Sequence, residues 1–347
     1  MKEVKLNNGN YNCKNCGSIL RFNPNTQSIE CDKCKFTYPL EYQKTFTRHI
    51  YNPNTANSTE RNEWIADNKV FSCDNCGSHI IANKYEMSLT CPYCDTHLII
   101  DKEALPGLKP DGIIPFAFDK KTANEKFVAS IKKQFYVNGM FKKQLPDSQI
   151  KGTYIPCFVY DMDTTSQYRG TLCVFKRKNG ETYRHHFAIS GTFEKKYNNI
   201  IVESSSKIEQ YQLEKILPFE TSSAVDYQNE YILGYTVEHY ADTLEKCEEV
   251  ANKSVNRKIR TDILKKYQYD EVSLLNVKTN FKQREYNYIL LPVYKFEYKF
   301  KNKSYTTYMN GQTGKTDKNL PKSVPKIVMT FILVILLLIL LFATQIH

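Results

Sequence analysis

The strongest hydrophobic pattern in the chain lies near its C-terminal end. Residues 327–343 form a run of seventeen residues without a charged side chain, in which Leu, Ile and Val cover every face of a helix. Extended to Ile346, this run gives about 30 Å of helix at a rise of 1.5 Å per residue, which matches the hydrocarbon core of a bilayer. The pattern therefore predicts a transmembrane helix; the alternative is a helix buried in a soluble core.

Basic residues precede this apolar run. Between residues 301 and 326 only Asp317 opposes six lysines, which are Lys301, Lys303, Lys315, Lys318, Lys322 and Lys326. Positive residues that flank a span stay on the cytoplasmic side and are attracted to anionic lipid. We therefore expect residues 321–347 to form a basic collar and a tail anchor in the lipid bilayer. The protein would be a single-pass protein of the cell membrane with the bulk of the chain in the cytoplasm.

Residues 105–320 alternate between strand-like runs and amphipathic helical stretches. One helix is predicted after Asp119, with a capping box at Thr122 and Glu125. A longer helix is predicted over about 242–267, with an apolar stripe that consists of Leu244, Cys247, Ala251, Val255, Ile259 and Ile263. The dipeptide Asn179-Gly180 predicts a two-residue hairpin turn, and a second hairpin is centred on Asn302.

This middle region also repeats part of its own pattern. The segment IIPFAF at 113–118 is similar to ILPF at 216–219, and YIPCFVYD at 154–161 is similar to ILLPVYKFEY at 289–298. Proline at the start of a strand is tolerated because its missing donor need not break the ladder. The region is therefore predicted to be a duplicated α+β domain with an antiparallel sheet.

Eight of the eleven cysteines form two sets with identical spacing, C-x2-C, fourteen residues, C-x2-C. The first set is Cys13, Cys16, Cys31 and Cys34; the second is Cys73, Cys76, Cys91 and Cys94. Two residues between cysteines let a tight turn present both sulfurs to one ion, and a second such turn completes a tetrahedron of four thiolates. The sets predict two zinc ribbons with one structural zinc ion each. The alternative is disulfides or scattered core cysteines, which the absence of a secretory signal disfavours.

These patterns divide the chain into a multidomain protein. Residues 1–45 are assigned to the first zinc ribbon, 46–66 to a polar, solvated linker and 67–104 to the second ribbon. Residues 105–320 form the α+β domain and residues 321–347 the tail. His79 and His97 lie near the second set, but four cysteines already fill the coordination sphere of a zinc ion.

The charge distribution argues against nucleic acid as the partner of the ribbons. The chain carries a formal charge of +11, yet residues 1–104 hold twelve basic and twelve acidic residues. Four thiolates around a zinc dication add a charge of about −2, so neither metal-bound ribbon attracts phosphate. Aromatic residues that could stack on bases are Tyr11, Phe22, Phe36 and Tyr38. Protein partners fit the ribbons better.

No pattern of catalytic residues is evident in the middle domain. Its nucleophile and base types are Cys157, Cys173, His185, His186 and His239, and no nucleophile elbow or ligand spacing organises them. The segment NGQTGKT at 310–316 imitates a phosphate-binding loop, but Met309 replaces the first glycine and prolines follow instead of a helix. We interpret this segment as a hairpin turn and predict that the protein is not an enzyme.

Several segments together resemble a family of bacterial membrane proteins with transcription-factor-IIB-type zinc ribbons. They are the doubled CxxCG…CxxC, LPGLKPDGIIPFAFDK, GTYIPCFVYD, YILGYTVE and LPVYKFEYKFKNKSYTTYMNGQTGKT, and the resemblance covers nearly the whole chain. Members are often labelled primosomal replication helicase, but this sequence has no helicase motor motif. Members of this family tend to carry Trp after the Pro of the GxYxP strand, where this chain has Cys157 and Phe158.

The resemblance implies a role in an envelope-stress operon, with a flotillin-like protein and the phage-shock protein PspA as partners. Together with the residue patterns, it suggests a non-enzymatic, membrane-anchored adaptor that presents cytoplasmic protein-interaction surfaces. The alternative is a nucleic-acid-binding regulator held at the membrane. A third hypothesis is a hydrolase built around Cys157 or His185.

Overall fold

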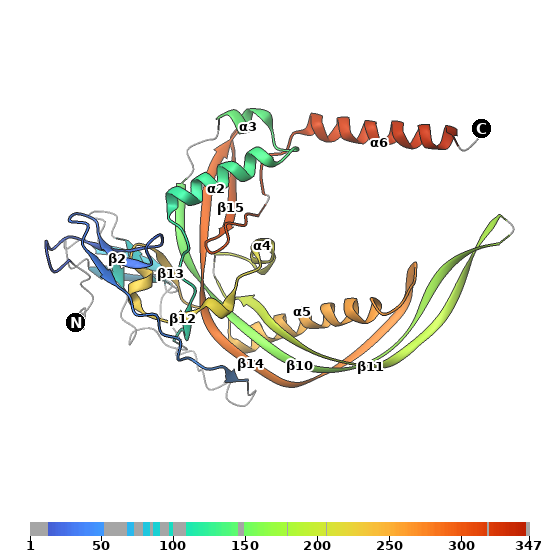
Figure 1. Ribbon diagram of the computed structural model, residues 1–347, viewed down its shortest axis with the longest axis horizontal. Coiled ribbons are helices and arrows are strands. Elements are labelled where there is room, and N and C mark those ends of the chain that lie inside the picture. Colours follow the sequence, from blue (N-terminus) through green and yellow to red (C-terminus); the bar gives the residue numbers. More distant parts are fainter. Residues whose placement is uncertain are drawn as a thin grey trace.

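The computed structural model describes residues 13–51, 68–72, 79–83, 86–90, 97–99, 109–144, 149–178, 180–205, 207–317 and 319–344. The body is a ten-stranded sheet, mainly antiparallel, with helices packed against it, and a three-stranded sheet lies beside it (Figure 1). The small sheet contains β1 (Leu20–Asn23), β2 (Ser28–Cys31) and β3 (Thr37–Pro39), in the antiparallel order β1-β2-β3. The prediction of a cysteine-rich N-terminal unit and a sheet-rich body is confirmed to this extent.

Two strands of thirty residues each form the centre of the body. They are β10 (Gln149–Lys178) and β14 (Glu271–Phe300), which pair antiparallel from one end to the other. Each folds back as a hairpin, into β11 (Glu181–Glu203) and β15 (Lys303–Asn310) respectively. Figure 1 shows that β10, β11 and β14 curve together into a long arm.

Both predicted hairpin turns are confirmed. Lys178 pairs with Glu181 across a two-residue turn in which Gly180 has a φ of 84°. Phe300 pairs with Lys303 across a turn whose two residues, Lys301 and Asn302, have φ values of 47° and 60°. Positive φ at these positions matches the right-handed twist of the flanking strands.

The order strand, helix, long strand and return strand occurs twice in the body. The first unit is β9 (Gly112–Ile113), α2 (Lys120–Lys133), β10 and β11, and the second is β13 (Thr236–Glu238), α5 (Leu244–Leu264), β14 and β15. Each short strand pairs parallel with the long strand of the other unit, β9 with β14 and β13 with β10. The equivalent of β9 is therefore β13. Residues 216–219, which the sequence pattern matched to this strand, instead start at the last residue of α4 (Gln210–Ile216) and continue beyond it.

The two prolines of the long strands lie where the neighbouring strand changes. Pro156 separates the part of β10 that pairs with β13 from the part that pairs with β11, and its carbonyl accepts from Ser204 N at 3.0 Å. Pro292 separates the β9 and β15 pairings of β14, and its carbonyl accepts from Gly311 N at 2.8 Å. In an antiparallel strand the N–H and the C=O of one residue point toward the same neighbouring strand. The N–H that each proline lacks would therefore point toward the place where one neighbouring strand ends and the next begins, so no hydrogen bond of the sheet is lost.

The helices bury the faces that their apolar spacing predicts. All six residues of the predicted stripe in α5 are buried, at 5% exposure or less. Phe127 of α2 stacks on Phe296 of β14 at 4.2 Å between ring centroids. The N-cap of α2 is Asp119, whose carboxylate accepts from Thr122 N at 2.8 Å, so the capping box predicted at Thr122 is wrong by three residues.

The remaining elements are short. They are β4 (His49–Ile50), β5 (Asn68–Ser72), β6 (His79–Asn83), β7 (Glu86–Thr90), β8 (His97–Ile99), α3 (Gly139–Gln144), β12 (Val225–Asp226) and the 3-10 helices Thr221–Ser223 and η3 (Asn229–Ile232). Strand β4 belongs to the segment expected to be a solvated linker, yet it pairs with β14. His49 also contacts Asp111 at 2.7 Å and Arg48 contacts Asp161 at 3.1 Å. The described part of this segment is therefore packed against the body.

The C-terminal helix α6 (Val324–Thr344) extends away from the sheet (Figure 1), and its apolar side chains between Val328 and Ile339 are exposed. The expectation of a single-pass membrane protein is wrong, because no helix in the described part of the chain is long and apolar enough to cross a bilayer.

Candidate metal centre

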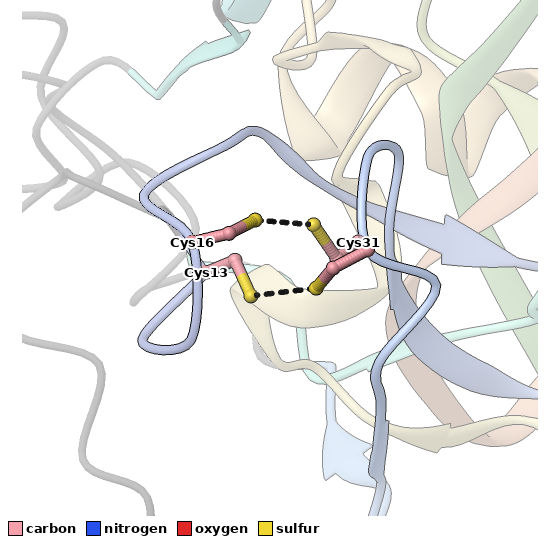
Figure 2. A group of neighbouring side chains, drawn as sticks. Cys13, Cys16 and Cys31 are labelled. Atoms are coloured by element: carbon pink, nitrogen blue, oxygen red, sulfur yellow. Dashed lines mark hydrogen bonds between the residues drawn. The ribbon is translucent and has the colours of Figure 1, made fainter.

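The four cysteines of the first set come together at one end of the small sheet. Cys13 and Cys16 lie on the turn before β1, and Cys31 ends β2 (Figure 2). Cys34 lies on the turn between β2 and β3. Their sulfur atoms all lie within 4.8 Å of one another. Within the described residues, this is the group of cysteine, histidine and carboxylate side chains that could hold a metal ion.

The spacing of the sulfurs fits a tetrahedral ion. A Zn–S bond of about 2.3 Å places two ligand sulfurs about 3.8 Å apart in a regular tetrahedron. The distance from Cys13 Sγ to Cys34 Sγ is 3.6 Å, and that from Cys16 Sγ to Cys31 Sγ is 3.5 Å. All four cysteines are free thiols rather than disulfide partners. The residues therefore fit a metal held by four thiolates.

Hydrogen bonds from the turns prepare some of these sulfurs to carry negative charge. The Tyr38 hydroxyl, 3.5 Å from Cys13 Sγ, is the main cause that lowers the pKa of Cys13 to about 6, and backbone N–H groups of Asn15 and Cys16 act in the same direction. The backbone of Phe36 likewise lowers the pKa of Cys34. Such donors to ligand sulfurs orient the ligands and stabilise thiolates in metal sites.

Cys16 shows why a cation is needed. At Cys16 the backbone of Ser18 lowers the pKa, but burial together with the neighbouring thiols Cys31, Cys34 and Cys13 outweighs this bond and raises the pKa to about 11. Four thiolates at this spacing repel one another, so they cannot all ionise near neutral pH without a counter-charge. A bound dication supplies that charge.

The small sheet is fixed to the body by an apolar contact. Leu20, Ile29 and the two buried cysteines pack with Leu233, which follows η3 and has 0% exposure. Phe22 N donates to Leu233 O at 3.1 Å, and the Phe22 ring contacts Tyr231 edge-on at 5.4 Å. A metal that orders the small sheet therefore also orders its contact with the body.

The second set, Cys73, Cys76, Cys91 and Cys94, lies outside the described residues. The strands on either side of these cysteines are described: β5 pairs antiparallel with β6, and β7 pairs antiparallel with β8. Strand β7 also joins the main sheet through β13, where Ser88 Oγ donates to Tyr235 O at 3.0 Å.

The other candidate residues do not converge on a site. Cys157 and Cys247 are buried, and burial raises the pKa of both, that of Cys247 to about 12. Cys173 is also buried, His185 and His186 lie on the exposed part of β11, and the ring of the buried His239 contacts the Tyr240 carbonyl at 3.3 Å. Buried thiols with raised pKa values are poor nucleophiles.

The segment at 310–316 is a turn, as predicted. Asn310 Oδ1 accepts from the backbone N–H groups of Gln312 and Thr313 at 2.8 and 2.9 Å, and Gly314 has a φ of 79°. An isolated bridge between Met309 and Thr316 closes it.

Two contributions to the metal centre could not be read from the sequence. The sequence pattern presents Tyr38 only as a residue that could stack on a base and does not indicate its hydroxyl contact with Cys13. The contact with Leu233 joins positions about 200 residues apart and has no local signal.

The fold and the cysteine cluster define a sheet-rich protein with a site suited to a metal ion. No family model matches the chain. No solved structure matches it. Among curated proteins, the uncharacterized protein YdjG of Bacillus subtilis (strain 168) is 27% identical over 311 residues, which cover 88% of this chain and 88% of that protein.

Proposed function

We propose that this chain is a non-enzymatic zinc-binding adaptor that presents binding surfaces to other proteins. The cluster of four cysteine sulfurs is the observation that carries the proposal. A site of four cysteines leaves no coordination position for water or substrate, so its ion holds shape instead of performing chemistry. Small sheets that lack a core of their own commonly depend on such an ion for folding.

The proposal includes a second structural zinc ion. Cys73, Cys76, Cys91 and Cys94 repeat the spacing of the first set, each shifted by sixty residues. Strands β7 and β8 pair antiparallel in the register of β2 and β3 shifted by sixty residues, so that Ser88 pairs with Ile99 as Ser28 pairs with Pro39.

Proteins are supported over nucleic acid as partners by the side chains of the small sheet. Phe22 is 3% exposed, so its ring is not free to stack on a base, and the Tyr38 hydroxyl contacts Cys13. Two basic residues of this unit are also paired, Arg21 with Asp32 at 2.6 Å and Lys35 with Glu30 at 3.2 Å.

Co-purification with the partners implied by the family resemblance tests this proposal. A flotillin-like protein and the phage-shock protein PspA should be retained by the full chain and lost, by about tenfold or more, with the double substitution Cys13→Ser and Cys31→Ser. Lys33→Ser, on the exposed turn between two ligands, is the matched control and should retain them. Equal retention by all forms, or by none, would contradict the proposal. Salt-dependent retention of DNA or RNA would favour a nucleic-acid-binding regulator.

A further inference from the structure

Strand β11 has one free edge. It pairs with β10 along its length, and no other strand in the described part of the chain pairs with it. Near its end, the Gln210 side chain donates to Ile201 O at 3.1 Å and accepts from Glu203 N at 2.9 Å, which occupies the outward-facing groups there. Just before this point β11 is irregular, because Asn199 has a φ of 58° and the register with β10 shifts between Tyr197 and Ile200. The regular edge therefore ends at Tyr197, and the strand up to that residue keeps backbone groups that can pair with another extended chain.

A cleft of about 600 Å³ lies at the end of this part of the edge. Residues of β11 between 195 and 201 form one side of it, and α4 and α5 form the others. Figure 1 shows α5 lying along the concave side of the arm to which β11 belongs. Because neighbouring strands lie about 4.8 Å apart, a peptide paired with this edge would occupy the cleft beside α5.

The charged side chains of the cleft favour an acidic occupant. Four are basic and two are acidic, namely Lys195, Arg257, Lys258 and Lys265 against Glu214 and Asp262. Both carboxylates are already paired: Asp262 contacts Lys195 at 2.7 Å and Lys265 at 3.2 Å, and Glu214 contacts Arg257 at 3.8 Å. The net charge of these six side chains is +2.

Lys258 is the basic residue of the cleft that takes part in none of these ion pairs. Among the described residues it forms no ion pair within 4 Å, although burial lowers the pKa of its ammonium group. A carboxylate bound beside this ammonium would replace water that the cleft partly excludes. Charge-assisted contacts of this kind are about twice as strong as neutral hydrogen bonds.

We propose that the cleft between β11 and α5 binds an extended acidic segment of a partner protein as an added strand on β11. Backbone pairing would supply affinity, and the lysine and arginine side chains of α5 would select carboxylates at alternate positions. The inference rests on the proposed adaptor function for its biological use, and it identifies one surface that such an adaptor would offer.

Fluorescence anisotropy with labelled ten-residue peptides tests the proposal on the full, metal-loaded chain. The probe alternates Glu and Val, and two matched peptides replace Glu by Lys or methylate alternate backbone nitrogens. The Glu-Val peptide should bind about tenfold more tightly than either matched peptide. The Lys peptide lacks the negative charge that the cleft favours, and the methylated peptide lacks N–H groups that strand pairing requires. Equal binding of the methylated peptide would overturn the proposal, as would tighter binding of an oligonucleotide of equal charge.

Charge reversal at a residue of α5 tests whether the peptide binds in this cleft. Lys258→Glu should weaken binding of the Glu-Val peptide by about tenfold, and Lys258→Gln by a smaller factor. Lys253→Glu, on the same helix but outside the cleft, should change the affinity by less than about twofold. An unchanged affinity in Lys258→Glu, with an unchanged circular dichroism spectrum, would refute the site. Failure of peptide binding leaves co-purification that depends on the cysteines unaffected, so the two proposals fail separately.

Discussion

The substitution Glu203→Gln tests the electrostatics of the body at one carboxyl group. Glu203 ends β11, and its carboxylate accepts from Ser205 N at 2.7 Å. Burial raises the pKa of Glu203 from 4.5 to about 7, because it outweighs the Ser205 hydrogen bond, and the carboxylates of Asp242 and Glu238 add to the rise. The folded chain therefore disfavours the ionised form of this group.

The sign of the stability effect follows from the raised pKa. Between pH 4.5 and about 7 the folded chain keeps a proton on Glu203 that the unfolded chain releases, so this group lowers the free energy of unfolding as pH rises. At about 1.4 kcal/mol per pKa unit the penalty is at most about 3 kcal/mol, and partial exposure to solvent reduces it to about 1 to 2 kcal/mol. Glu203→Gln should exceed the wild type by about this amount at about pH 8 and match it at about pH 4.

Urea unfolding followed by circular dichroism measures this difference. Wild type and Glu203→Gln are compared at each pH, so that effects common to both proteins, such as protonation of metal ligands, cancel. Glu194→Gln is the control, because Lys282 at 3.0 Å lowers the pKa of that exposed carboxyl, and its removal should give no gain at high pH. A gain for Glu203→Gln that is the same at all pH values would refute the reasoning.

Three further substitutions probe packing and the metal centre. Leu233→Ala removes the apolar contact beneath the small sheet and should lower the free energy of unfolding in urea by about 2 to 4 kcal/mol. Phe36 is exposed, so Phe36→Ala is the control and should lower the free energy of unfolding by less than about 1 kcal/mol. Tyr38→Phe removes the hydroxyl beside Cys13 and should weaken zinc affinity about tenfold in chelator competition; unchanged affinity would contradict that role. Gly311→Ala places a Cβ 2.5 Å from the Phe116 ring and should lower the melting temperature through a loss of about 1 to 3 kcal/mol.

Local patterns predicted the features that depend on neighbouring residues. The stripe of α5 follows from the 3.6-residue period, the turns at Gly180 and Asn302 follow from residues that tolerate positive φ, and the first cysteine cluster follows from knuckle spacing. Each of these features places its residues within about thirty positions of one another in the chain.

Long-range pairing limited the rest of the prediction. Periodicity gives no register between β10 and β14, whose partners Gln149 and Glu297 lie about 150 residues apart, and it could not show that β13 rather than residues 216–219 corresponds to β9. The length of the uncharged run near the end of the chain and the lysines before it predict a membrane span, but the described helix does not meet the length and apolarity that a span requires.

Metal content per chain tests the central claim most directly. The account predicts two zinc ions in the purified full chain by elemental mass spectrometry, and one ion fewer after the double substitution Cys13→Ser and Cys31→Ser. An unchanged zinc content in the double variant, or a wild type that carries no zinc, would show that the four sulfurs do not hold a structural ion.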